Sequence, residues 1–254
     1  MKFVASIASA ALLAGIAVPA NAAVTFGQFL QKDPSARLFQ YLKQDVGLTK
    51  KAELHTTGTA ASSTTASIPV YYLMSVAGLP ADLTGLQDAH LTVDFLSNVG
   101  TTASGLSRSQ VFATGSISLI RDTAAAEGLG TRTNLLTVTF TDAELDASQG
   151  AGAFTFKSNA LSSITYSSDF LNFAKVITKD FSFSFSGANP TFQAAPGSSS
   201  RSMRFSGTGT FASDPAPVIP GVPEASTWAM MMVGFGVAGA ALRTSRRSKE
   251  LFAA

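Results

Sequence analysis

The sequence predicts a mainly β protein whose core is antiparallel and of the β-sandwich or jelly-roll type. Short runs alternate apolar and polar residues, and clusters of Gly, Asn and Ser separate them. In the clearest run, residues 181–186, three phenylalanines alternate with three serines. Strict alternation gives a strand one buried face and one wet face, as in antiparallel sheets. We therefore expect a β-sandwich domain over residues 66–213.

The N-terminus has the parts of a cleavable signal helix. Lys2 supplies a positive charge, residues 3–18 are apolar and uncharged, and Ala20 and Ala22 form a small-x-small site. Signal peptidase cleaves after such a site, so residues 1–22 are predicted to be removed and Ala23 to begin the mature chain. The protein is therefore expected to be exported.

The next segment, residues 23–48, is expected to be helical. Its apolar residues fall near helical spacing, and Pro34 is tolerated in a first helical turn, which predicts a short N-terminal helix over about residues 34–45. Residues 49–65 are polar and rich in Thr and Ser, which predicts a loop that contains His55.

The strands of the predicted sandwich follow, with two interruptions. The segment from Thr141 to Glu144 has a capping-box pattern, which predicts a helical turn. Residues 197–202 are predicted to form a flexible tip. The alternating runs are residues 68–72, 91–96, 117–120, 136–140, 154–156 and 181–186.

The composition excludes several classes of protein. The chain has 254 residues, of which 13% are charged, with a formal net charge of +2 and no cysteine. A disulfide scaffold and a Cys-ligated metal site are ruled out, and the even charge balance argues against a nucleic-acid partner.

Residues with catalytic or metal-binding chemistry are few. His55 and His90 are the two histidines, and neither has a second histidine at ligand spacing, so no zinc site is predicted. No Gly-x-Ser-x-Gly elbow supports a hydrolase. No glycine-rich phosphate loop is present, and the sequence predicts no cofactor and no enzyme.

Two clusters of charged residues leave alternative functions open. Asp142, Glu144 and Asp146 supply oxygens of the kind that calcium prefers, but they lack the glycine and distal glutamate of an EF-hand loop. Arg201 and Arg204 flank Met203, where they would line a solvated strand face or meet an acidic polysaccharide.

The C-terminal region predicts a membrane anchor. Residues 214–221 form a Pro-rich linker. Residues 225–242 contain no charge, and Trp228 lies near the start of this run. A run of about 17–25 apolar residues spans a bilayer as a helix. The positive-inside rule places the basic tail in the cytoplasm. This basic tail contains Arg243, Arg246, Arg247 and Lys249.

Residues 222–247 resemble the PEP-CTERM sorting signal in its PEPxxWA variant. Ala225 stands where the second proline of the family pattern is usual. The resemblance implies a secreted protein of a Gram-negative bacterium, held in the inner membrane by its tail and processed by an exosortase. The residues that carry it are Val222, Pro223, Glu224, Trp228, Ala229, Gly234, Phe235, Gly236, Arg243, Arg246 and Arg247.

These signals favour an exported, non-catalytic protein of the cell surface or extracellular matrix. Bacteria with this sorting signal typically make exopolysaccharide, so an association with exopolysaccharide or biofilm is expected. The expected partners are signal peptidase, the exosortase, the inner membrane and exopolysaccharide. One alternative is a module that binds carbohydrate or an ice surface, and a secreted hydrolase is a further alternative. The binding module is suggested by Thr137, Thr139, Thr208 and Thr210.

Overall fold

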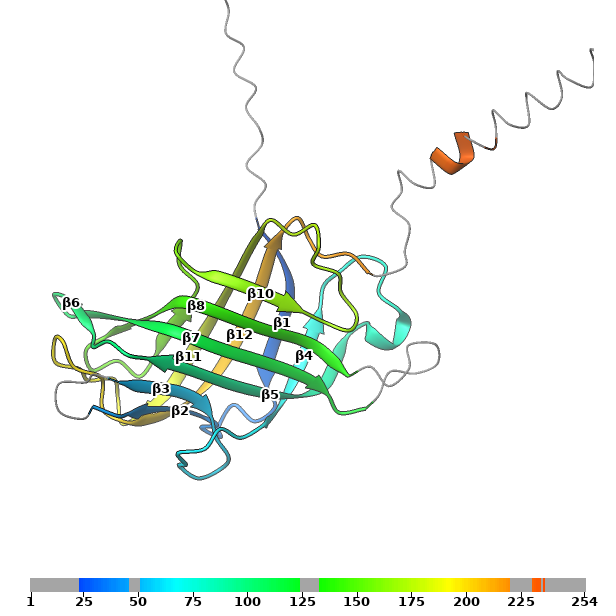
Figure 1. Ribbon diagram of the computed structural model, residues 1–254. Helices are drawn as coiled ribbons and strands as arrows, with labels where there is room; N and C mark the ends of the chain where they lie inside the picture. The colour runs from blue at the N-terminus through cyan, green and yellow to red at the C-terminus, as the bar shows by residue number, and fades with distance from the viewer. Residues whose placement is uncertain (1–22, 46–50, 124–132, 220–229, 234, 236–254) are drawn as a thin grey trace, which may run out of the picture.

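The computed structural model describes residues 23–45, 51–123, 133–219, 230–233 and 235 (Figure 1). Within residues 23–219, the described helical structure is one 3-10 turn, η1 (Ala81–Leu83). The strands are β1 (Val24–Gln31), β2 (Phe39–Lys43), β3 (Ala52–Thr56), β4 (Ile68–Met74), β5 (Leu86–Ser97), β6 (Thr102–Ser104), β7 (Ser107–Arg121), β8 (Asn134–Ser148), β9 (Phe154–Lys157), β10 (Ser163–Ser167), β11 (Thr178–Asn189) and β12 (Met203–Asp214).

All of these strands belong to one antiparallel sheet. β12 pairs with β11 along one edge, and with β2 and then β1 along the other. β5 pairs with β7 along one edge, and with β4 and then β3 along the other. Since β1 also pairs with β4 and β2 with β3, the sheet returns on itself. The closed path runs β1, β4, β5, β7, β8, β9, β11, β12 and back to β1.

The predicted mainly antiparallel β fold is therefore confirmed at this level. The two-sheet sandwich or jelly roll is not confirmed, because the strands form a single 12-stranded sheet. The interior that this sheet encloses is aromatic. Phe181, Phe183 and Phe185 point inward, as the alternation predicts. Phe95 stacks on Phe156 at 4.5 Å between ring centroids, and Phe29 meets Phe183 edge to face at 5.0 Å.

Glycines on the inner face of β12 leave room for these rings. A Cβ at Gly209 would lie 2.3 Å from Phe29 Cε1 and 2.4 Å from Phe183 Cδ1. A Cβ at Gly207 would lie 2.6 Å from Phe185 Cδ1. Any larger residue at these inward positions would therefore displace the aromatic core.

The predicted helix over residues 34–45 is wrong. Residues 23–45 contain β1 and β2, which pair with β12, and β1 also pairs with β4. The segment's helix-like spacing has a local cause. The β1–β12 register shifts between Thr25 and Gly27, so Phe26 and Phe29 are both buried although three residues apart.

The predicted loop over residues 49–65 is wrong in its first part. Residues 52–56 form β3, which pairs with β2 and β5. The strands of residues 24–56 thus belong to the same sheet as those of residues 66–213.

The helical turn predicted at Thr141–Glu144 is also wrong, because β8 runs through it as a strand paired with β7. Asp142 has φ 58°, and here β8 exchanges its neighbour β10 for β9. The predicted tip at residues 197–202 is packed against the domain, since Ser199 and Ser200 are buried.

The predicted Pro-rich linker begins as part of the folded domain. The backbone amide of Asn172 donates to the Val218 carbonyl at 2.7 Å, and the Val218 amide donates back at 3.2 Å. Pro217 is buried, and Ile219 packs against the core.

The predicted signal helix, residues 1–22, lies outside the described residues. Of the predicted membrane span, residues 230–233 and 235 are described, and they are helical. Among the residues that the structure describes, no helix is long and apolar enough to cross a membrane.

Candidate functional site

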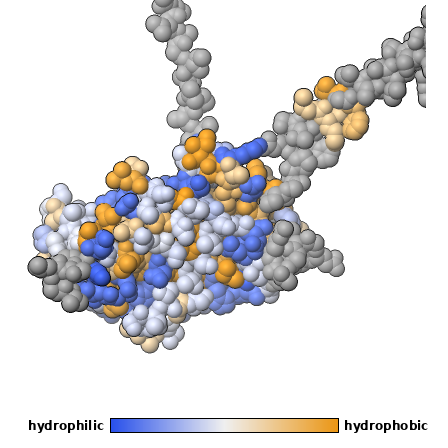
Figure 2. Space-filling view, viewed as in Figure 1, coloured by the Kyte–Doolittle hydropathy of each residue, from blue (hydrophilic) through white to orange (hydrophobic). Residues whose placement is uncertain are grey.

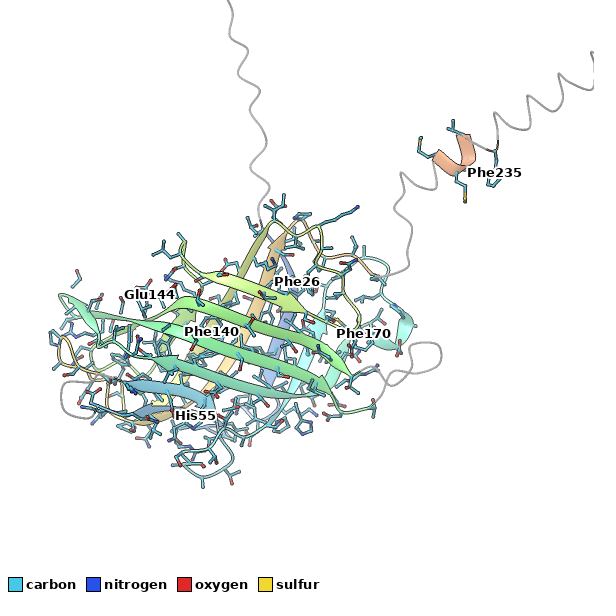
Figure 3. All side chains as sticks on the ribbon, viewed as in Figure 1. Phe26, His55, Phe140, Glu144, Phe170 and Phe235 are labelled. Atoms are coloured by element: carbon cyan, nitrogen blue, oxygen red, sulfur yellow. The ribbon has the colours of Figure 1, made fainter. Side chains whose placement is uncertain are left out.

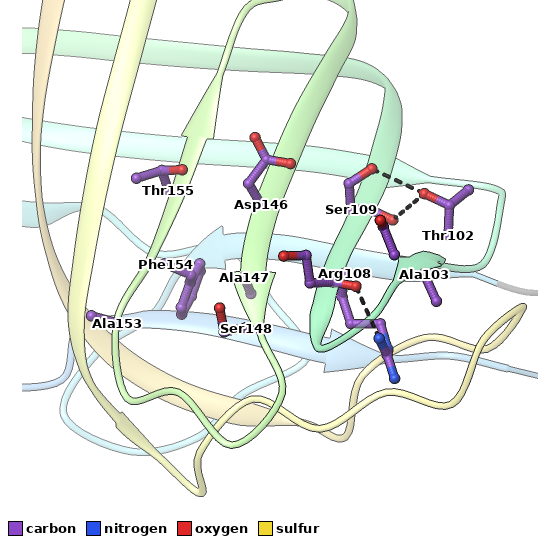
Figure 4. A pocket seen from close by; sticks show the side chains of 12 residues that line it. Thr102, Ala103, Arg108, Ser109, Asp146, Ala147, Ser148, Ala153, Phe154 and Thr155 are labelled. Atoms are coloured by element: carbon purple, nitrogen blue, oxygen red, sulfur yellow. Dashed lines mark hydrogen bonds between the residues drawn. The ribbon is translucent and has the colours of Figure 1, made fainter.

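A polar cleft lies between the β6–β7 hairpin and strands β8 and β9 (Figure 4). Its volume is about 390 Å³, within the roughly 300–1,000 Å³ typical of ligand pockets. Small hydroxyl residues dominate its walls, with one guanidinium and one carboxylate. The lining residues are Thr102, Ala103, Ser104, Ser107, Arg108, Ser109, Asp146, Ala147, Ser148, Ala153, Phe154 and Thr155.

Contacts within the cleft fix its polar groups. The Thr102 and Ser109 hydroxyls lie 3.1 Å apart. Arg108 Nη1 donates to the carbonyls of Gly105 and Ser107 at 2.8 and 2.9 Å, and its Nε donates to the Ala194 carbonyl at 3.0 Å. The hairpin that forms one wall of the cleft is thereby held against the segment before β12.

The carboxylate of the cleft is ion-paired. Asp146 Oδ2 lies 2.8 Å from Lys157 Nζ across the β8–β9 pair. The hydrogen bond that Lys157 donates to Asp146, and then the charge of Asp146, raise the pKa of Lys157, while burial opposes the shift and the charge of Glu144 adds to it. The cleft thus offers hydroxyl donors and acceptors near a neutralised charge pair. This chemistry suits a hydroxyl-rich ligand such as a sugar.

A second polar surface is the outer face of β7, β8 and β10, which lie side by side in Figure 1. Their register aligns hydroxyl side chains in rows across the three strands. The pale central area in Figure 2 is this face, since Ser and Thr have intermediate hydropathy. The rows are Thr114–Thr141–Ser163, Ser116–Thr139–Thr165 and Ser118–Thr137–Ser167.

The spacing of this hydroxyl face follows from β geometry. Neighbouring strands lie about 4.8 Å apart, and alternate residues along a strand lie about 6.8 Å apart. Thr137 and Thr139, singled out from the sequence, are therefore two members of a regular two-dimensional array. Their neighbours on β7 and β10 come from distant parts of the chain.

The other predicted pair, Thr208 and Thr210, lies on a different part of the outer face and has different neighbouring residues. These threonines line a groove of about 320 Å³ over β1, β4 and β12. The groove also contains Leu30, Tyr71 and Leu86, and Leu30 and Leu86 are 47% and 62% exposed. This face is mixed apolar and polar and does not continue the hydroxyl array.

The two histidines have structural partners. His55 lies in β3 rather than in a loop, and it is buried with its Nε2 3.1 Å from the Ser62 carbonyl (Figure 3). The loop that follows β3 therefore covers it. His90 lies on the exposed face of β5, with Nδ1 2.6 Å from Asp122 Oδ1.

The acidic residues Asp142, Glu144 and Asp146 do not converge in space. Ala143 and Leu145, between them, point inward, so the three carboxylates alternate along the outer face of β8. Within the described ranges, no group of three or more His, Cys, Asp or Glu residues is placed to hold a metal ion.

The two arginines predicted to line a strand face hold loops instead. Arg204 donates from Nη1 to the Thr59 carbonyl at 2.9 Å and from Nη2 to the Gly58 carbonyl at 2.7 Å. Arg201 donates from Nε to the Thr191 carbonyl at 3.0 Å. Neither guanidinium is directed only at solvent.

One buried polar cluster has no local signal in the sequence. The Tyr41 hydroxyl donates to Gln110 Oε1 at 2.6 Å and accepts from the Ser200 amide at 3.1 Å. Gln110 in turn donates from Nε2 to the Val99 carbonyl at 2.8 Å. Tertiary contacts between distant segments bring these groups together, so composition and spacing do not reveal them.

The residues of the two predicted processing sites lie largely outside the described ranges. Ala23 is described and exposed, whereas Ala20 and Ala22 are not described. Phe235 is described, helical and exposed. Val222, Pro223, Glu224, Trp228, Ala229, Gly234, Gly236, Arg243, Arg246 and Arg247 lie outside the described residues.

Comparison with known families identifies the C-terminal region. The family model for the PEP-CTERM protein-sorting motif matches residues 221–247. The chain carries a PEP-CTERM sorting motif. The PEP-CTERM match includes the residues that the sequence analysis assigned to the signal, and Ala225 in the second proline position does not prevent it. No curated protein and no solved structure matches the chain.

The PEP-CTERM motif supports an exported protein that is sorted to the cell envelope. It also implies processing by an exosortase-type enzyme. The motif begins at residue 221, two positions after Ile219, which packs against the core. The sorting motif therefore follows the folded β domain with almost no intervening spacer.

Proposed function

We propose that this chain is a non-catalytic protein of the cell surface or extracellular matrix that associates with exopolysaccharide. Its predicted signal peptide exports it, its predicted C-terminal helix holds it in the inner membrane, and exosortase processing then releases or transfers the β domain. The observation that carries the proposal is the PEP-CTERM motif at residues 221–247, joined directly to a closed β domain.

Mass spectrometry of the protein from the envelope and culture medium of producing cells tests the sorting route. The expected mature chain begins at Ala23 and ends near Glu224. Recovery of the native protein from the cytoplasm with both termini intact would overturn the proposal.

The cleft of Figure 4 supports the association with exopolysaccharide, because hydroxyl groups and the ion-paired carboxylate of Asp146 line a cavity of suitable size. A triple variant, Ser104→Ala, Ser109→Ala and Ser148→Ala, removes three of its hydroxyls with little change of shape. We expect it to co-precipitate less with exopolysaccharide from producing cells.

The matched control removes three exposed hydroxyls from β11, with Ser182→Ala, Ser184→Ala and Ser186→Ala. This variant should bind as the parent does. Equal binding by both variants would show that the cleft is not the contact site.

The hydroxyl face favours a second candidate function, binding to an ordered surface of carbohydrate or ice. Its rows on β7, β8 and β10 present hydroxyls at regular spacing. Thr139 is exposed in the central row, so Thr139→Lys should disrupt the array, while Thr178→Lys on β11 should not. A glycan array and an ice-recrystallisation assay that are both blank for the parent chain would exclude this candidate.

A further inference from the structure

The end of the β domain from which the tail leaves exposes apolar side chains. Ile177 is 83% exposed, Val24 is 48% exposed and Val218 is 40% exposed. Figure 2 shows apolar surface at the upper end of the domain, where β1 begins. We propose that this end is a membrane-contacting surface that rests on a phospholipid bilayer. The inference depends on the anchoring included in the proposed function.

The backbone around the end of β12 holds these side chains together. Val24 lies opposite Ser213 in the β1–β12 pair. On the other side of β12, the Ile177 amide donates to the Asp214 carbonyl at 2.9 Å. Val24 and Ile177 therefore flank one strand end at about two strand spacings, roughly 10 Å. The Asn172–Val218 bridge fixes Val218 on the same docked segment.

The length of the tether sets the distance to the membrane. The chain is docked as far as Ile219, and the predicted membrane span begins at residue 225. Even when fully extended, the residues 220–224 reach no more than about 18 Å. β12 itself, with 12 residues, is about 36 Å long. A domain on so short a tether keeps the Asp214 end of β12 toward the bilayer.

The charges at this end indicate which lipid property is recognised. Lys175 and Lys179 are accompanied by Asp169, Asp180 and Asp214, so the described residues here carry no positive surplus. The contact is therefore apolar rather than electrostatic. We expect it to form on neutral phosphatidylcholine vesicles and to persist at high salt.

The absence of cysteine in the chain makes the test direct. A single Ile177→Cys substitution in the full chain carries an environment-sensitive fluorophore, and the protein is reconstituted into phosphatidylcholine vesicles. The expected result is a blue shift of emission and loss of fluorescence when nitroxide-headgroup lipids are included. The control is Leu106→Cys in the β6–β7 hairpin, where Leu106 is 73% exposed. Its label should stay aqueous and unquenched.

Each other outcome counts against a defined part of the proposal. A chain that stays with the vesicles while the label at position 177 remains aqueous would overturn the contact surface and leave the anchoring intact. A chain that does not stay with the vesicles would overturn both. A label at position 177 that is shielded from water and cross-links to a second copy, without lipid quenching, would assign the surface to self-association instead.

Discussion

At the scale of single residues, the aromatic core depends on glycines, because a larger residue at their positions would collide with the phenylalanine rings. Gly209→Ala would place a methyl group within the van der Waals radii of Phe29 and Phe183. Overpacking of this kind typically costs about 1–3 kcal/mol. We expect the variant to lose about that much free energy of unfolding in a urea titration. Gly152→Ala is the control, because nothing lies within 4 Å of its Cβ position, and its stability should be close to that of the parent.

Buried tyrosines make the protein sensitive to alkali. Burial raises the pKa of Tyr41 to about 12, and its hydrogen bonds with Ser200, Ser199 and Gln110 oppose part of that shift. A folded-state pKa above the unfolded value of about 10 means that the neutral form stabilises the fold. This contribution is complete below pH 10 and is lost as the pH rises from 10 to 12. It amounts to about 3 kcal/mol for Tyr41.

We therefore expect the free energy of unfolding to fall steeply between pH 10 and 12, measured by chemical denaturation at fixed ionic strength. Burial also raises the pKa values of Tyr72 and Tyr166, so they add to the slope. Tyr41→Phe should lower stability at neutral pH and make the alkaline slope shallower. An unchanged slope in Tyr41→Phe would contradict the assignment.

At the scale of elements, the loop of residues 57–66 is clamped to the outer face of the sheet. Arg204 holds its first residues, and Gln40 accepts a hydrogen bond from the Ser62 amide at 3.1 Å. Arg204→Gln should loosen the loop and cost about 1 kcal/mol, a value reduced by solvent access. Hydrogen exchange at Ser62 and Ala66 should accelerate. Arg201→Gln, which releases Thr191 instead, should leave these two amides unchanged.

The loop of residues 57–66 also explains why some strands could be predicted from the sequence and others could not. Phe181, Phe183 and Phe185 alternate because one face of β11 is wet, and period two is visible there. Phe39, Gln40 and Tyr41 of β2 are all buried, because the loop of residues 57–66 covers the outer face. A strand buried on both faces loses its alternation, and the bulge in β1 adds an odd spacing. Together, these two features give the apolar residues of segment 23–48 a spacing close to that of a helix.

The candidate site could be predicted only in part for a related reason. Thr137 and Thr139 are recognisable as one face of a strand because they are two residues apart. The neighbours of Thr139 on the adjacent strands, Ser116 and Thr165, are about twenty-five residues away along the chain, and register alone makes them adjacent. The sorting motif, in contrast, is a contiguous segment, so the sequence contains all of its signal.

At the scale of the whole molecule, closure of the sheet pairs its first strand, β1, with its last strand, β12. β1 pairs with β12 and β4, and the last strand β12 pairs with β1, β2 and β11. Exposed strand edges invite aggregation, and closure removes most of them. A domain that is exported and sorted to the cell envelope, as the PEP-CTERM motif supports, benefits directly from this property.

Closure of the sheet also predicts which truncated chains can fold. A chain of residues 66–213, the boundaries expected from the sequence, lacks β1, β2 and β3. It would leave β12 without β1 and β2 and leave β5 without β3, and it would remove Phe26, Phe29 and Phe39 from the core. We expect no cooperative thermal unfolding from this fragment.

The C-terminal boundary allows a finer comparison between residues 23–219 and 23–213. The shorter chain loses three backbone hydrogen bonds, the two between Asn172 and Val218 and the one from Ile177 to Asp214, together with the buried Pro217. At about 0.5–1.5 kcal/mol per hydrogen bond, it should be less stable by roughly 1.5–4.5 kcal/mol, measured by urea denaturation of both chains. Equal stability would mean that residues 214–219 are only a spacer. The docked segment would then neither shorten the tether nor orient the domain on the membrane.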